Sequence, residues 1–155
     1  MKLKYWLPAI AWATVIFLFS TGSFSTDNTR SVLENLLEIA FPDLSFQVVL
    51  RINHLVRKLS HWAEYFIFAL LIYQGFRNQQ KKTWRWSWAV LTGCIIMNYA
   101  FLDELHQLFV PSRSADWRDS MLDTLGGICG LIMIYIRSWK HRGSPIASQA
   151  QKILE

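Results

Sequence analysis

The chain has 155 residues, of which 52% are hydrophobic and only 17% are charged. About a quarter of the residues in a soluble domain are usually charged, so this composition argues against an ordinary soluble domain. The net charge of +5 comes from clustered lysines and arginines, not from one basic face, which argues against a nucleic-acid partner. Cys94 and Cys129 lie within apolar stretches, so we expect two small apolar fillers rather than a disulfide.

The first apolar stretch, Tyr5–Ser20, follows Lys2 and Lys4 and is close to the roughly 17 residues that a short membrane span needs. A cleaved signal peptide also begins with basic residues, continues as an apolar stretch and ends in small residues. The length of the stretch and its tryptophans favour a retained span. Under either interpretation, the residues that follow face the outside of the cell.

The segment 21–60 is more polar, and it contains two apolar stripes at helical spacing. A capping-box pattern at residues 31–34 opens the first stripe, which continues to Ala40. The second stripe, Phe46–Leu59, has basic residues between its apolar positions. The sequence therefore predicts two short amphipathic helices on the outer membrane surface. A small cap that packs on the helix bundle and faces water is the alternative.

Three more apolar stretches follow in the sequence, namely Trp62–Phe76, Trp86–Leu102 and Met121–Trp139. The first of these reaches the length of a span only if its helix begins near residues 57–60. We therefore predict an all-α, polytopic membrane protein with four transmembrane helices. Its membrane domain comprises residues 1–142, and a polar cytoplasmic tail comprises residues 143–155.

The distribution of basic residues predicts the orientation of these helices. The loop between the second and third spans, residues 77–85, has four Lys or Arg residues and no acid. The segments before the first span and after the fourth are also basic. Because basic loops stay on the cytoplasmic side, both termini should be cytoplasmic in a multi-pass protein of the cell membrane.

This orientation brings polar side chains from three helices to one depth near the outer face. His61 and Glu64 enter with the second span at i, i+3 spacing, and Asp119 and Asp123 enter with the fourth at i, i+4. On the third span, Asp103, His106 and Gln107 share a face, and Glu104 is turned roughly 100° away, toward water or a basic loop residue. The candidate site comprises Arg57, Lys58, His61, Glu64, Asp103, Glu104, His106, Gln107, Arg113, Asp119 and Asp123.

Three interpretations of this outward-facing polar pocket stay open at this point. The residues are a hydrogen-bonded brace between helices, a binding site for a membrane-linked head group, or a catalytic site. In the binding interpretation Arg113 holds an anionic group. In the catalytic one, Glu64, Asp103 and His106 are the candidate acid–base or metal-ligand groups. Because the chain has no HExxH or similarly dense motif, we assign it no metal and no cofactor.

Gly126 and Gly130 form a GxxxG motif in the fourth span. Small residues at this spacing let a second helix approach closely, either within the bundle or in a dimer. We expect packing within the bundle, because the same helix carries the polar cluster inward. The oligomeric state stays open.

Three segments, RKLSHWAEY, DELHQLFVPSR and DSMLDTLGGICG, together resemble the VanZ-like membrane protein family. The resemblance covers the membrane part of the chain, from Lys4 to about Trp139, and its central motif is fairly specific. Two positions depart from the family pattern: Ser112 stands where glycine is common, and Asp123 stands where asparagine is common. The motif positions carried over are Arg57, Lys58, His61, Glu64, Asp103, Glu104, His106, Gln107, Arg113, Asp119 and Gly126.

The resemblance implies a prokaryotic cell membrane and a link to glycopeptide resistance, since the type member of the family is associated with low-level resistance to teicoplanin. It supplies no reaction. We therefore expect membrane lipids as partners, and a lipid-linked cell-wall or polysaccharide precursor as the component that the site binds or handles. A membrane-embedded hydrolase or transferase that acts on such a lipid is the alternative.

Overall fold

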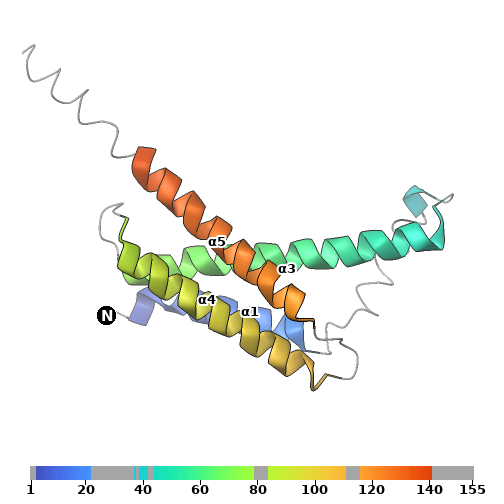
Figure 1. The fold of residues 1–155 in the computed structure, drawn as a ribbon, viewed down its shortest axis with the longest axis horizontal. Helices are drawn as coiled ribbons and strands as arrows, with labels where there is room; N and C mark the ends of the chain where they lie inside the picture. The colour runs from blue at the N-terminus through green and yellow to red at the C-terminus, as the bar shows by residue number, and fades with distance from the viewer. Residues whose placement is uncertain are drawn as a thin grey trace, which may run out of the picture.

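The computed structural model describes residues 3–21, 37, 39–41, 44–78, 84–110 and 116–140, and all of its regular structure there is helical. This confirms the all-α class for the described part of the chain. Figure 1 shows how the helices are arranged. The elements, in chain order, are the 3-10 helix η1 (Leu3–Tyr5) and the α-helices α1 (Leu7–Ser20), α3 (Phe46–Arg77), α4 (Trp86–Gln107) and α5 (Trp117–Lys140).

Successive long helices run in opposite directions (Figure 1). The start of α1, the end of α3, the start of α4 and the end of α5 lie at one end of the bundle. The end of α1, the middle of α3, the end of α4 and the start of α5 lie at the other end, which we call the site end. The first half of α3 projects beyond the site end. Among the helices, α5 packs most extensively against α3.

The length of α3 differs from the sequence prediction. The second amphipathic stripe and the second predicted span are not separate elements, because both belong to this one helix of 32 residues. The physical reason is the absence of a helix breaker: no proline lies in α3, and its one glycine, Gly75, lies in the last turn. The helix ends at Arg77 and is followed by the cap residue Asn78, which has a left-handed φ of 44°. The first amphipathic helix falls largely outside the described residues.

The other two long helices extend farther than their apolar stretches. Helix α4 continues past Leu102 to Gln107, and α5 begins at Trp117, before Met121. Both extensions are mainly polar and contain no proline or glycine, so the helical backbone hydrogen bonds continue beyond the apolar part. As a result, the candidate residues Asp103 and Glu104 belong to helix α4 and Asp119 belongs to helix α5, and none of them lies in a loop.

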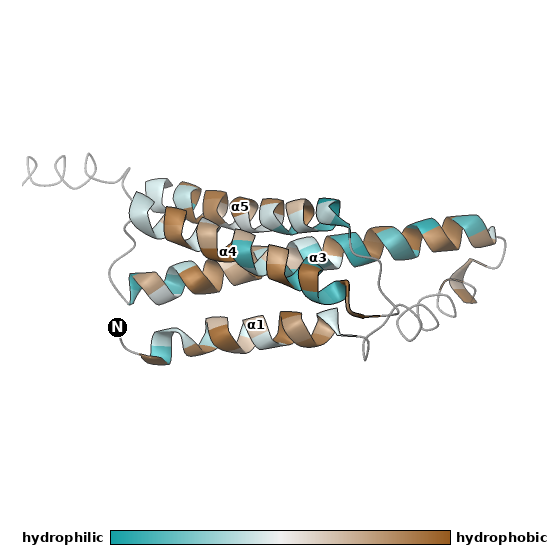
Figure 2. Cartoon of the chain, turned by 60° about the horizontal axis from the view of Figure 1, so that its bottom comes forward, coloured by the Kyte–Doolittle hydropathy of each residue, from teal (hydrophilic) through white to brown (hydrophobic). Residues whose placement is uncertain are grey.

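Among the described helices, α4 and α5 are long and apolar enough to cross a membrane. Helix α1 is apolar but has only 14 residues, or about 21 Å at 1.5 Å per residue. Helix α3 is long enough, but His61, Glu64 and Gln74 interrupt its apolar half. Figure 2 shows that the projecting half of α3 alternates between hydrophilic and hydrophobic residues. Large apolar side chains are exposed along both α4 and α5.

Helix α1 is attached to the bundle by two hydrogen bonds between side chain and backbone. The indole of Trp12 donates to the backbone carbonyl of Glu64 at 2.9 Å. The hydroxyl of Tyr99 donates to the backbone carbonyl of Ala13 at 2.7 Å. At the start of α1, the Trp6 ring packs edge-on against Phe76 with ring centroids 4.8 Å apart. These contacts hold α1 against α3 and α4.

The glycines of α5 allow it to approach α3 and α4 closely. A Cβ on Gly126 would collide with the backbone carbonyl oxygen of Trp62, and one on Gly130 would lie 2.7 Å from that of Phe66. A Cβ on Gly127 would lie 2.7 Å from Ile96 of α4. The predicted packing of the GxxxG motif within the bundle is therefore confirmed. Both cysteines are free thiols, but Cys94 is exposed on α4 and does not fill the core as predicted.

Candidate functional site

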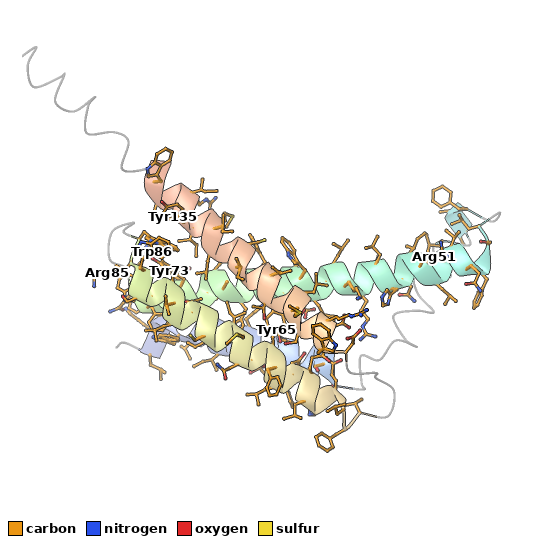
Figure 3. The ribbon with its side chains drawn as sticks, viewed as in Figure 1. Arg51, Tyr65, Tyr73, Arg85, Trp86 and Tyr135 are labelled. Atoms are coloured by element: carbon orange, nitrogen blue, oxygen red, sulfur yellow. The ribbon has the colours of Figure 1, made fainter. Side chains whose placement is uncertain are left out.

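The middle of α3 brings the first pair of candidate residues to the site end. His61 and Glu64 are one helical turn apart, and the imidazole Nδ1 lies 3.8 Å from the carboxylate Oε2. Each of these side chains is only 14% exposed. Tyr65, on the next position of α3, is completely buried. Figure 3 places Tyr65 between α3 and α4.

The last turns of α4 supply the second group. Asp103 and Gln107 are both buried, and the Gln107 amide donates a hydrogen bond of 3.1 Å to Oδ2 of Asp103. Their i, i+4 spacing places them on the same face, as the sequence predicts. Gln107 thereby orients the Asp103 carboxylate from one side.

The start of α5 supplies the third group. Asp123 is 1% exposed, so its carboxylate is inside the bundle. Asp119, one turn earlier, lies closer to the surface and pairs with Lys58 of α3, with Oδ1 and Nζ 3.1 Å apart. The Lys58 and Asp119 side chains are 35% and 20% exposed, so this ion pair lies at the rim of the site.

Residues from three helices meet at the centre of the site. One donor atom each of His61 (α3), Asp103 (α4) and Asp123 (α5) lies within 4.8 Å of the other two. We call these three residues the three-helix cluster. They come from the three segments that the sequence analysis places at one depth. Two carboxylates this close together in a buried position need a compensating cation or proton, because their repulsion is weakly screened there.

Glu104 is buried at the end of α4. It does not face water, because it is only 8% exposed and its carboxylate accepts the backbone N–H of Asp116 at 3.0 Å. Asp116 in turn accepts the backbone N–H of Arg118 at 3.0 Å. Glu104 therefore ties the end of α4 to the start of α5, and it holds the helix that carries Asp123 in place.

The remaining candidates are dispersed. The His106 ring packs against Phe17 of α1 with centroids 4.9 Å apart, and His106 does not belong to the three-helix cluster. Arg57 is partly buried and close enough to Glu104 for the two charges to interact. Arg113 lies outside the described residues.

The contribution of α1 is absent from the list of candidates derived from the sequence. Trp12 binds the backbone of Glu64, and Phe17 contacts His106, so α1 covers one side of the site. The only sequence signal for this contact is Trp12 itself, because a buried indole N–H needs a hydrogen-bond acceptor. The sequence does not show which residue provides that acceptor.

Comparison with known protein families identifies the chain. The family model described as VanZ/LLP1 matches residues 5–138, which include all the described helices from α1 to α4 and nearly all of α5. The chain belongs to the VanZ/LLP1 family. Comparisons with curated proteins and with solved structures give no significant match. Membership of the VanZ/LLP1 family, together with the apolar helices α4 and α5, indicates a membrane protein.

Proposed function

We propose that this VanZ/LLP1-family protein crosses the cell membrane four times, with both termini in the cytoplasm. The antiparallel order of the helices (Figure 1) and the basic loop 77–85 support this topology. The site end then faces outward. At about 48 Å, α3 is longer than the roughly 30 Å hydrocarbon core, so its projecting half lies beyond that core on the outer side.

We further propose that the site end binds the polar head group of a cell-envelope lipid or lipid-linked precursor. The observation that carries this proposal is the three-helix cluster, which combines buried charged groups with an apolar exterior. Large apolar side chains surround the same end of α4 and α5 and are between 41% and 62% exposed: Phe101, Leu102, Leu105, Met121 and Leu125. An amphiphile could rest its acyl chains on these residues while its head group reaches the cluster.

A basic surface next to the cluster supports a phosphate-bearing ligand. The projecting half of α3 borders a hollow of about 430 Å³, which is lined by Gln47, Leu50, Arg51, His54, Leu55 and Lys58. Lys58 also pairs with Asp119 at the rim of the site, so the hollow and the site are adjacent. Arg51 is on this projecting half (Figure 3). Lysine and arginine are the usual partners of phosphate groups, and Arg113 in the connection to α5 adds another.

This function fits the association of the type member of the family with teicoplanin resistance. The proposed site would bind an envelope component at the outer face of the membrane, where such precursors are displayed. A change in the handling of such a component would alter glycopeptide sensitivity without any contact between this protein and the antibiotic.

Lipid binding by the purified protein tests the proposal. We expect wild-type protein in detergent to retain phosphatidic acid and polyprenyl phosphate in native mass spectra, and not the uncharged diacylglycerol. Lys58→Ala and Arg113→Ala should each weaken retention about tenfold, the effect of one charge-assisted contact worth about 1.4 kcal/mol. Arg137→Ala, an exposed arginine near the far end of α5, is the matched control and should retain lipid normally. Equal retention of the charged and uncharged lipids would refute the anion site.

A membrane-embedded hydrolase or transferase is the second candidate function. The contact between His61 and Glu64, beside two buried aspartates, favours it, since an imidazole next to a carboxylate is a common acid–base pair. His61 suits this role better than His106, which packs against α1. Here Glu64→Gln should retain the fold and lipid binding but abolish release of product from a lipid-linked substrate. Full turnover by this variant would exclude Glu64 as acid or base.

A further inference from the structure

We infer that the three-helix cluster binds one divalent transition-metal ion, with His61, Asp103 and Asp123 as its protein ligands. The sequence alone gives no sign of a metal site, because these ligands are far apart in the chain and form no local motif. The inference goes beyond the proposed lipid function and does not depend on it, since an ion in this position would stabilise the bundle with or without a lipid.

The geometry is close to that of a metal site. Ions such as Zn²⁺ bind imidazole nitrogen and carboxylate oxygen at about 2.0–2.2 Å, which places ligand atoms roughly 3–4 Å apart. The three donor atoms of the cluster lie within 4.8 Å of one another. Small rotations of the side chains therefore suffice to bring them into coordination. Glu64, 3.8 Å from His61, is in position to add a fourth ligand or to orient the imidazole.

The surroundings of Asp123 give the second, independent indication. Its side chain is 1% exposed, and Oδ1 has no hydrogen-bond partner among the described residues. The charged side chains that act on Asp123 are themselves carboxylates, and they repel its negative charge: Asp103, Glu104, Glu64 and Asp119. Lys58, which approaches from the rim, pairs with Asp119. A cation at the cluster would provide the opposite charge that a buried carboxylate requires.

The ligand set indicates the type of ion. One imidazole nitrogen and two carboxylate oxygens favour Zn²⁺ or Mn²⁺, whereas Ca²⁺ and Mg²⁺ prefer sites made only of oxygen. Because the three ligands belong to three different helices, the ion would also hold α3, α4 and α5 together. Binding should therefore raise the melting temperature of the protein.

Metal analysis of the full-length protein tests this inference. The protein is purified in detergent through a tag without histidine, stripped with chelator, incubated with ZnCl₂ or MnCl₂ alone, desalted and measured by inductively coupled plasma mass spectrometry. We expect about one ion per chain in the wild type, and a loss of at least tenfold in His61→Ala and Asp123→Asn. Asp116→Asn is the matched control, because it removes a carboxylate near the site but outside the cluster.

A second measurement keeps the test valid if a variant folds poorly. The chosen ion should raise the melting temperature of the wild type and of Asp116→Asn, and leave that of Asp123→Asn unchanged. Absence of bound metal in a monodisperse wild-type sample, or full binding by Asp123→Asn, would overturn the inference. Lipid retention is measured separately. Bound metal without selective lipid binding would refute the proposed function but not the ion site. Selective lipid binding without bound metal would refute the ion site but not the proposed function.

Discussion

Replacement of Gly126 by alanine tests the packing that brings Asp123 to the three-helix cluster. A Cβ at this position would collide with the backbone carbonyl oxygen of Trp62, and it would lie 3.0 Å from the carbonyl carbon. Ordinary carbon contacts are about 3.5–4.0 Å, and a backbone carbonyl in a helix cannot rotate away as a side chain can. Helix α5 must therefore move away from α3.

The expected cost follows from two opposing terms. Overpacking of a close interface costs about 1–3 kcal/mol, and the rigid backbone partner places this case near the upper limit. Alanine in place of glycine within a helix stabilises the folded protein by about 0.5–1 kcal/mol. The net destabilisation is therefore about 2 kcal/mol, which lowers the melting temperature by about 4–8 °C for a protein of this size.

Gly93→Ala is the matched control. It lies in α4, and a Cβ there would have no atom within 4 Å, so only the helix-propensity gain applies and the melting temperature should rise slightly. Both variants can be followed by intrinsic tryptophan fluorescence during heating in detergent, because the chain has eight tryptophans. A Gly126→Ala protein that melts at or above the wild-type temperature would refute the close contact between α3 and α5.

Three further predictions concern the attachment of α1, the rim of the site and the topology. Tyr99→Phe removes the hydrogen bond to α1 and should cost about 1 kcal/mol in thermal unfolding; an unchanged melting temperature would contradict this bond. A double-mutant cycle of Lys58→Ala and Asp119→Asn should give a coupling below about 1 kcal/mol, because this ion pair is partly exposed; a larger value would mean a desolvated pair. Reporter fusions after Gln79 and after Ser114 should lie on opposite sides of the membrane, with Ser114 outside; a shared side would overturn the topology.

Much of the helical framework could be predicted from the sequence, because apolar stretches and basic loops are each short continuous segments that can be recognised without knowledge of the fold. The order of the long helices and the meeting of His61, Asp103 and Asp123 both follow from residue spacing and alternating direction. The continuity of α3 could not be predicted from polarity alone. The change from an amphipathic to an apolar pattern resembles a boundary, but no residue between Phe46 and Gln74 breaks a helix.

The direction of individual side chains at the site was harder to predict. His106 and Gln107 are neighbours in α4, yet Gln107 binds Asp103 while His106 packs against α1. Spacing predicts which residues share a helix face, but the rotation of the helix against its neighbours decides which face points inward. Glu104 shows the same limit, because its role depends on where the backbone of α5 begins.

A cryo-electron microscopy structure of the wild-type protein in a lipid nanodisc, prepared with zinc or manganese present, would test the site itself. We expect density for an ion between His61, Asp103 and Asp123, and for a lipid phosphate beside Lys58, at the outer end of the bundle. Density maps in which the three side chains are bonded only to protein groups, with no ion and no head group at this end, would contradict this expectation. The cluster would then be a brace between helices.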